Sequence, residues 1–171
     1  MPVNVEFKAK ASDIKGLEVK LSSLSPTFIG EDHQIDTYFN VPKGRLKLRE
    51  GNIENALIYY EREDTNEAKQ SNVLLYRHSP DAALKEMLIK VHGTKTIVDK
   101  RRRIYFVDNV KIHFDEVKGL GTFIEVEAIS QSDEKSLSEL RAQCDKFSLL
   151  FQISKEDYIS CSYSDMLPKK R

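Results

Sequence analysis

Charged residues of both signs recur at every second position in several short segments of this 171-residue chain. In residues 4–10, Glu6, Lys8 and Lys10 alternate with apolar residues, as side chains on opposite faces of a strand would. The same alternation along the chain collects Glu6, Lys8, Lys10, Arg45, Lys47, Arg49, Arg62, Lys111, Asp115, Glu125 and Glu127. Carboxylates bind Mg²⁺ or Mn²⁺ through oxygen, and Arg and Lys bind phosphate oxygens. The mixture therefore points to a metal-bound polyphosphate.

The two signs are distributed unevenly. Acids lie in the first segment and in residues 115–127, whereas bases dominate residues 45–62 and the run 100–103. A sheet with one packed and one solvated face would explain any single segment. Taken together, the segments favour a closed barrel in which a basic wall faces an acidic corner. A nucleic-acid site is excluded, because the carboxylates would repel the phosphate backbone.

The elements that must position these residues are mostly strands. The alternation predicts strands over about 3–10, 34–40, 45–50, 56–63, 72–77, 95–107, 110–117 and 122–129. Helices are predicted over about 12–24, from Ser79 to Gly93, over about 133–150 and from Ser154 onward. Ser12, Ser79 and Ser154 are the expected N-caps, and Asp157 completes a capping box with Ser154. Short turns between most strands indicate an antiparallel sheet or barrel of the α+β class.

Composition limits the function classes. Lys+Arg and Asp+Glu are both 27, so the net charge of zero gives no general attraction to nucleic acid or membrane. The two cysteines, Cys144 and Cys161, lack metal-ligand spacing. No apolar run is long enough for a membrane span or a signal peptide, so we expect a cytoplasmic protein. The length fits one domain, residues 1–171.

A set of motifs in a fixed order resembles the CYTH superfamily, the triphosphate tunnel metalloenzymes. The matching segments are Asn4–Lys8, Asp36–Phe39, Arg45–Arg49, Tyr59–Arg62, Lys100–Tyr105, His113–Asp115, Gly119–Glu127 and Ser162–Asp165. They cover nearly the whole chain, and the last two are most similar to the class four adenylate cyclase branch. The superfamily also includes thiamine triphosphatases and tripolyphosphatases.

The resemblance implies an eight-stranded antiparallel tunnel with a polar lumen, helices outside, and one or two Mg²⁺ or Mn²⁺ ions. By position it makes Glu6, Glu125 and Glu127 metal ligands with Asp115 beside them. Phosphate would be held by Lys8, Arg49, Arg62, Lys100 and Arg102, and catalysis would fall to Lys8, Arg102 and Asp115. By parity alone, the further lumen candidates are Lys10, Arg45, Lys47 and Lys111. Parity leaves open whether Lys100 and Arg102 or Arg101 and Arg103 face inward, and the family spacing favours the first pair.

One position departs from the family pattern. Asn4 stands where the first Glu of the signature Glu-x-Glu-x-Lys is expected. An amide oxygen can bind a metal but brings no charge, so the change predicts a weaker site or one ion fewer. The family resemblance implies either an adenylate cyclase that makes cyclic AMP and pyrophosphate or a triphosphatase. The change at Asn4 adds a third function, a non-catalytic binder of nucleotide or polyphosphate. His113 shares the lumen parity, and we interpret it as a structural histidine whose ring nitrogens are satisfied. The expected partner is a small-molecule triphosphate, and a homodimer paired through a strand edge stays open.

Overall fold

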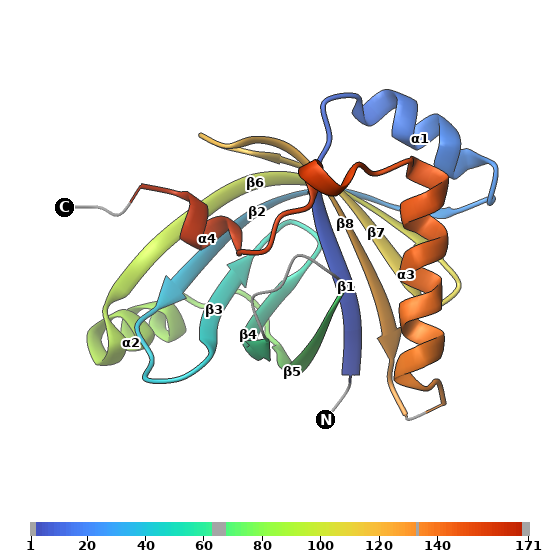
Figure 1. Ribbon diagram of the computed structural model, residues 1–171. Coiled ribbons are helices and arrows are strands. Elements are labelled where there is room, and N and C mark those ends of the chain that lie inside the picture. The colour runs from blue at the N-terminus through green and yellow to red at the C-terminus, as the bar shows by residue number, and fades with distance from the viewer. Residues whose placement is uncertain (1–2, 63–67, 133, 169–171) are drawn as a thin grey trace.

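Eight antiparallel strands follow one another around a closed ring in the order β1-β5-β4-β3-β2-β6-β7-β8 (Figure 1). The computed structural model describes residues 3–62, 68–132 and 134–168. The strands are β1 (Val3–Lys10), β2 (Thr27–Phe39), β3 (Arg45–Glu50), β4 (Asn55–Arg62), β5 (Lys69–Arg77), β6 (Thr94–Val107), β7 (Val110–Val117) and β8 (Gly121–Ser130). The α+β class and the antiparallel strands agree with the prediction from sequence.

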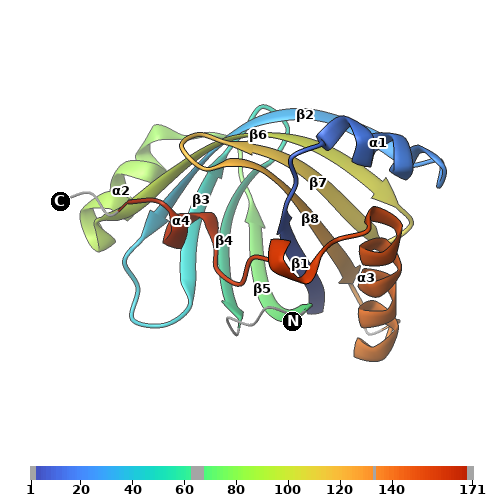
Figure 2. The same ribbon diagram turned by 45° about the horizontal axis from the view of Figure 1, so that its top comes forward.

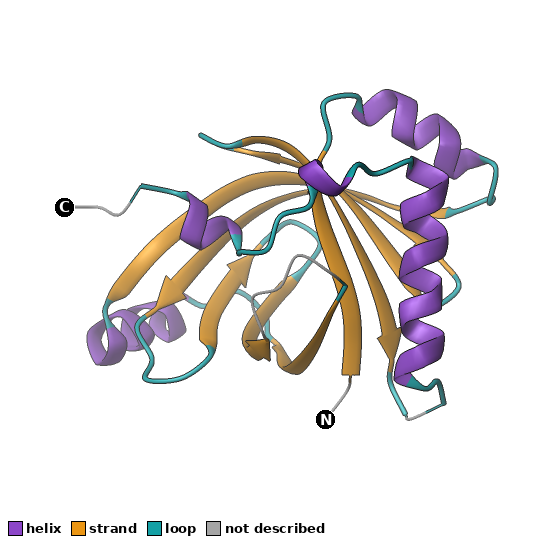
Figure 3. Cartoon of the chain, viewed as in Figure 1, coloured by secondary structure: helices purple, strands orange, loops and turns teal. Residues whose placement is uncertain are grey.

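Most of the helices lie outside the ring, as Figure 3 shows by colour. The last helix does not, because its Tyr163 packs against the inward-facing Phe123, so the expectation that all helices pack outside was wrong for this one. The helices are α1 (Ile14–Ser22), α2 (Ala82–His92), α3 (Leu137–Phe151), a 3₁₀ turn η1 (Lys155–Asp157) and α4 (Tyr163–Met166). No helix in the described ranges has both the length and the apolar character that crossing a membrane requires.

Several predicted helix ends were wrong. Asp13, not Ser12, caps α1, and its carboxylate accepts the backbone N–H of Gly16 at 3.0 Å. Asp81, not Ser79, caps α2, because Asp81 reaches the N–H of Ala83 at 2.8 Å. The segment after Ser154 makes only the turn η1, without a side-chain cap.

The expected terminal capping box lies further along the chain. It joins Ser162 and Asp165 at the start of α4, where both reciprocal bonds are present. After Ser154 the chain makes only the turn η1 and then pairs with β1 at Tyr158. Asp157 therefore does not cap an α-helix.

Strand β2 begins at Thr27, seven residues earlier than the alternation predicted. Polar residues such as Asp32 and Gln34 hide this part of the strand in the sequence, although both are fully buried. The early part pairs with β6 across a register shift between Phe28 and Gly30. The extension matters because Asp32 and Gln34 hold the turn between β3 and β4.

The main hydrophobic core lies between helices and the outer face of the ring. The alternate residues Val5, Phe7 and Ala9 of β1 point outward and pack with β7, β8, α1 and α3. From α3, Leu140 and Phe147 are buried against them. Figures 1 and 2 show α1 and α3 together on this side of the ring. Because the apolar residues point outward here, the charged residues of β1 and β8 face the inside of the ring.

The chain after α3 returns across β1 and ends near β3 (Figures 1 and 2). Tyr158 forms a bridge with Ala9, and the N–H of Ile159 donates to the carbonyl of Lys8 at 2.9 Å. Further on, Asp165 accepts a hydrogen bond from Arg45 of β3 at 2.7 Å. Residues 158–166, here called the C-terminal segment, thus tie two strands of the ring together.

Candidate functional site

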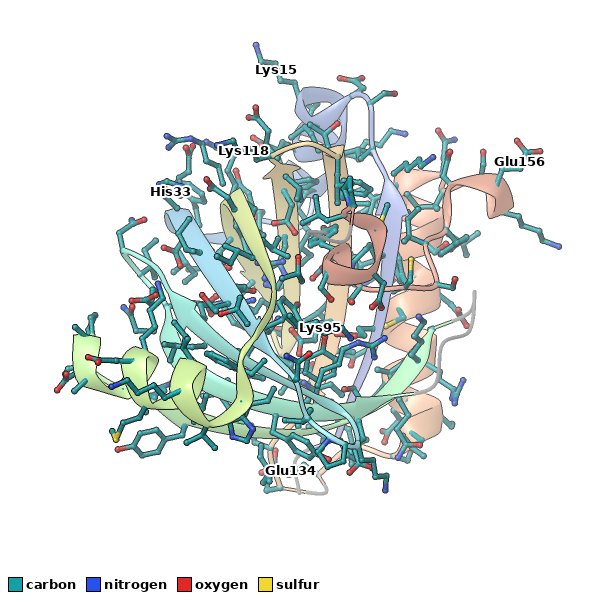
Figure 4. The ribbon with its side chains drawn as sticks, turned by 90° about the vertical axis from the view of Figure 1, so that its left-hand side faces the viewer. Lys15, His33, Lys95, Lys118, Glu134 and Glu156 are labelled. Carbon is teal, nitrogen blue, oxygen red and sulfur yellow. The ribbon has the colours of Figure 1, made fainter. Side chains whose placement is uncertain are left out.

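A cavity of about 970 Å³ lies inside the ring and is lined by residues from all eight strands. Figure 4 shows nitrogen and oxygen atoms of side chains between the strands as well as around the outside of the molecule. The charged residues that line the cavity are Glu6, Lys8, Lys47, Arg49, Glu54, Arg77, Lys100, Arg102, Lys111, Glu125 and Glu127. Most of the charged stripe that the sequence predicted therefore meets in one space.

The structure answers the question of register in the basic run of β6. Lys100 and Arg102 are buried and line the cavity, whereas Arg101 is exposed and Arg103 pairs with Glu18 on the outer surface. The apolar neighbours of Lys100 and Arg102 do not contradict this register, because Ile104 also lines the cavity.

One wall of the cavity is apolar. Ile58 and Tyr60 of β4 lie beside Leu75 and Val73 of β5, and all four line the cavity. Sequence analysis missed this wall because it followed charged residues alone. The cavity therefore offers an apolar surface in addition to its charged groups.

A buried carboxylate gathers three cations of the cavity. Asp36 accepts two hydrogen bonds from Arg49, both at 2.9 Å, and one from Lys100 at 2.8 Å, and Lys47 lies 3.3 Å away. Burial opposes ionisation of Asp36, but these three cations outweigh it and hold the pKa of its carboxyl well below the usual value. Asp36 thus keeps the three basic side chains side by side.

A second buried cluster surrounds Arg102. Its guanidinium donates two hydrogen bonds to Asp115, both at 2.7 Å, and one to Glu125 at 3.1 Å. Asp115 also accepts the hydroxyl of Tyr163, from the C-terminal segment, at 2.7 Å. Both oxygens of Asp115 thus accept hydrogen bonds, and Asp115 does not line the cavity.

Two carboxylates and an amide form the acidic corner. Glu6 and Glu127 face each other across β1 and β8, and the amide nitrogen of Asn4 donates to Glu127 at 2.5 Å. Burial and the neighbouring Glu6 raise the pKa of Glu127 to about 7. The amide oxygen of Asn4 is buried and has no hydrogen-bond partner among the described residues. This corner therefore contains one buried oxygen acceptor that no described residue satisfies.

His113 lies beside Glu125 in the Arg102 cluster. Its Nδ1 is 3.3 Å from Glu125, and burial, with Arg102 nearby, lowers its pKa to about 4, so the ring is neutral at pH 7. Its Nε2 is buried without a partner among the described residues. The expectation of a fully satisfied structural histidine was therefore wrong.

Some predicted residues do not reach the cavity. Lys10 is exposed at the end of β1, and Arg45 is held by Asp165 near the C-terminal segment. Arg62 ends β4, but its side chain lies outside the described part of the chain.

Sequence reasoning missed three residues that shape the site: Asp36, Glu54 and Tyr163. Asp36 shares the strand face of Tyr38, which lines the cavity, so parity could have found it. Glu54 follows a turn and Tyr163 follows a loop, where no alternation gives a direction.

A family model described as the CYTH domain matches residues 3–163, almost all of the described chain. The chain belongs to the CYTH domain family. This CYTH domain is 27% identical to the adenylate cyclase CyaB of Aeromonas hydrophila over 172 residues, covering 93% of this chain and 85% of the relative.

Solved structures share the fold of this CYTH domain. A protein of Pyrococcus horikoshii has a TM-score of 0.83 at 21% identity, covering 96% of this chain and 99% of the other. A Hippeastrum protein described with a dominant triphosphatase activity has a TM-score of 0.62 at 14% identity, covering 97% of this chain and 93% of the other. Both likenesses concern the fold alone.

Proposed function

We propose that this CYTH domain binds a triphosphate in its cavity and converts it with the help of a divalent cation, most simply as an adenylate cyclase. The observation that carries the proposal is the cavity itself, in which a basic wall around Asp36 and Arg102 faces the corner of Glu6 and Glu127. The ring then acts as a tunnel with a partly polar lumen. The adenylate cyclase relative at 27% identity supports this choice within the family.

The basic side chains would hold the phosphates. Lys8, Arg49, Lys100, Arg102 and Lys111 all line the cavity, with Lys47 beside them. Triphosphate oxygens accept charge-assisted hydrogen bonds, and Arg supplies them in pairs. The phosphate contact of Arg62 stays a prediction, because its side chain lies outside the described part of the chain.

The acidic corner fits a divalent cation. Two observations support a cation there: the Asn4 oxygen has no partner among the described residues, and burial together with Glu6 raises the pKa of Glu127. In the described residues no three His, Cys, Asp or Glu side chains form a ready-made metal site. We assign the ion to Glu6, Glu127 and the Asn4 oxygen, with Glu125 nearby. Mg²⁺ or Mn²⁺ would supply Lewis-acid stabilisation of charge on the phosphates.

The residues of the chain then have distinct tasks. Lys8 and Arg102 would neutralise charge that develops on the phosphates. In that step the ribose 3′-hydroxyl loses its proton to solvent, its oxygen bonds to the α-phosphorus, and the bond from that phosphorus to pyrophosphate breaks. Asp115 and Tyr163 hold Arg102 in position, so we give Asp115 a positioning task rather than a place on the metal. The apolar wall of β4 and β5 would contact uncharged parts of the ligand.

The triphosphatase and the non-catalytic binder are the competing functions, and one assay separates all three. Purified protein is incubated with Mn²⁺ or Mg²⁺ and with ATP, thiamine triphosphate or tripolyphosphate, and the products are separated. Cyclic AMP with pyrophosphate supports the cyclase, and orthophosphate supports the triphosphatase. If the ligand raises the melting temperature but is not turned over, the non-catalytic binder is supported. The neutral Asn4, in place of a metal-binding Glu, would explain that loss of activity. Neither turnover nor stabilisation with any ligand refutes the proposal.

Arg49→Ala and Glu125→Ala should each lower turnover or binding at least tenfold, because each removes a charged group from the cavity. Glu116→Ala is the matched control for Glu125, since Glu116 is exposed on β7. Unchanged activity in both cavity variants would show that the ligand binds elsewhere.

Binding should also take up a proton at Lys100. Burial, with Arg49 and Arg102 nearby, lowers the pKa of Lys100 to about 7 despite its bond to Asp36. At pH 8 the amine of the free protein is therefore mostly neutral, and an arriving triphosphate favours the ammonium form. We expect uptake of up to about one proton per ligand. Titration calorimetry in two buffers of different ionisation enthalpy measures it. Lys100→Met should lower the uptake, and Lys118→Met, at an exposed position, should leave it unchanged.

A further inference from the structure

The turn between β3 and β4 is fixed by a fully buried carboxylate. Asp32 of β2 accepts the backbone N–H groups of Ile53 and Glu54, each at 2.9 Å, and the side chain of Gln34 at 2.8 Å. At Gly51 an added Cβ would lie 2.6 Å from an oxygen of Asp32, so only glycine allows this approach. The turn is therefore held in one place rather than free at the edge of the ring.

This fixed turn directs Glu54 into the cavity. One carboxylate oxygen of Glu54 accepts from Gln34 at 2.9 Å and from Arg49 at 3.4 Å. The other oxygen bonds to the ammonium of Lys111. Lys111 belongs to β7, and β2 and β6 lie between β3 and β7 in the ring. The carboxylate thus links two separate parts of the cavity wall.

The partners of Glu54 are the groups that a phosphate would need. Arg49 and Lys111 both line the cavity and belong to the proposed phosphate wall. Burial opposes ionisation of Glu54, but Lys111 and Arg49 outweigh it and hold the pKa of the carboxyl well below its usual value. A phosphoryl group presents the same kind of oxygen acceptor with more charge.

We propose that Glu54 occupies the place of a phosphoryl group in the free protein, and that a triphosphate must displace its carboxylate to reach Arg49 and Lys111. This inference rests on the proposed function. It makes Glu54 a specificity-determining residue, because a ligand with a single charged group gains little by replacing one carboxylate with another anion. A triphosphate brings enough charge to take both cations and to bind the remaining basic wall as well.

The test uses inorganic tripolyphosphate without divalent cations and compares Glu54→Gln with the wild-type protein by titration calorimetry. Glutamine keeps the size of the side chain and removes its charge, so we expect about tenfold tighter binding. Glu50→Gln is the matched control on the same hairpin, because Glu50 pairs with Lys85, which does not line the cavity, at 2.8 Å. This control should bind like wild type.

A second variant guards against a local effect of the glutamine. Glu54→Ala also removes the carboxylate and should also bind tripolyphosphate more tightly, with a folded state confirmed by thermal unfolding. If wild type binds and both variants bind equally or more weakly, the role of Glu54 is overturned while the proposed function stands. If neither wild type nor the variants bind any triphosphate, the proposed function fails and takes this inference with it.

Discussion

Arg102→Ala is expected to abolish triphosphate binding and to lower the free energy of unfolding by about 3–5 kcal/mol. The guanidinium is the shared donor to Asp115 and Glu125, and its side chain is only 4% exposed. Its loss leaves two carboxylates without their main cation, one of them fully buried. Urea unfolding measures the loss of stability, and calorimetry with tripolyphosphate measures the loss of binding.

Arg101→Ala is the control for this prediction. Arg101 is the adjacent residue on the same strand, but its side chain is 60% exposed and lies 3.9 Å from Glu31 on the outer surface. Its removal should change stability by no more than about 0.5 kcal/mol and should leave binding intact. Similar losses of stability and binding in both variants would show that the buried ion pairs of Arg102 contribute no more than the exposed side chain of Arg101.

A double variant separates the two effects of Arg102. Adding Asp115→Asn to Arg102→Ala removes an unpaired buried charge, while Tyr163 can still donate to the amide oxygen. Stability should therefore recover in part, but triphosphate binding should not. Recovery of both would mean that Arg102 acts only through the fold.

Asn4→Glu is expected to raise the affinity for Mn²⁺ on the order of tenfold, since a charged oxygen ligand replaces a neutral one. The position adjoins Glu127 at 2.5 Å and carries an oxygen without a partner among the described residues, so the new carboxylate starts beside the other oxygens of the corner. Without metal, the third carboxylate should lower the melting temperature, because it adds repulsion to Glu6 and Glu127. Turnover should rise if the ion limits catalysis.

Asn4→Ala gives the opposite result and completes this test. It removes the amide oxygen and should weaken Mn²⁺ binding below that of wild type. Calorimetric titration with Mn²⁺ alone, together with melting temperatures with and without the ion, needs no substrate. Equal Mn²⁺ affinity in the glutamate and alanine variants would show that the ion is not bound at this corner.

Alternation along strands predicted most of the charged residues that line the cavity, because parity fixes the face of a residue as soon as a strand is recognised. It brought Glu6 and Lys8 to one side of β1 and Glu125 and Glu127 to the same side of β8, where the structure pairs them. It did not settle the run 100–103, since apolar residues occupy both faces of β6, and family spacing made that choice.

What sequence could not provide comes from contacts between distant segments. The direction of Glu54 depends on Asp32, 22 positions earlier, in a stretch without alternation. The occupation of Asp115 depends on Tyr163, 48 positions later and beyond α3. Neither contact leaves a local pattern, so parity could place Asp115 on the inner face but could not show that its carboxylate is already taken.

The C-terminal segment has a consequence for how the site comes into being. Lys8 of β1 contacts three residues of the C-terminal segment. Its carbonyl accepts the N–H of Ile159, and its ammonium donates to the carbonyl of Cys161 and lies over the ring of Tyr163. The ring also closes between β1 and β8, a pairing that spans more than a hundred residues and is expected to form slowly. A growing chain therefore cannot complete the surroundings of Lys8 until residues as far as Tyr163 have left the ribosome.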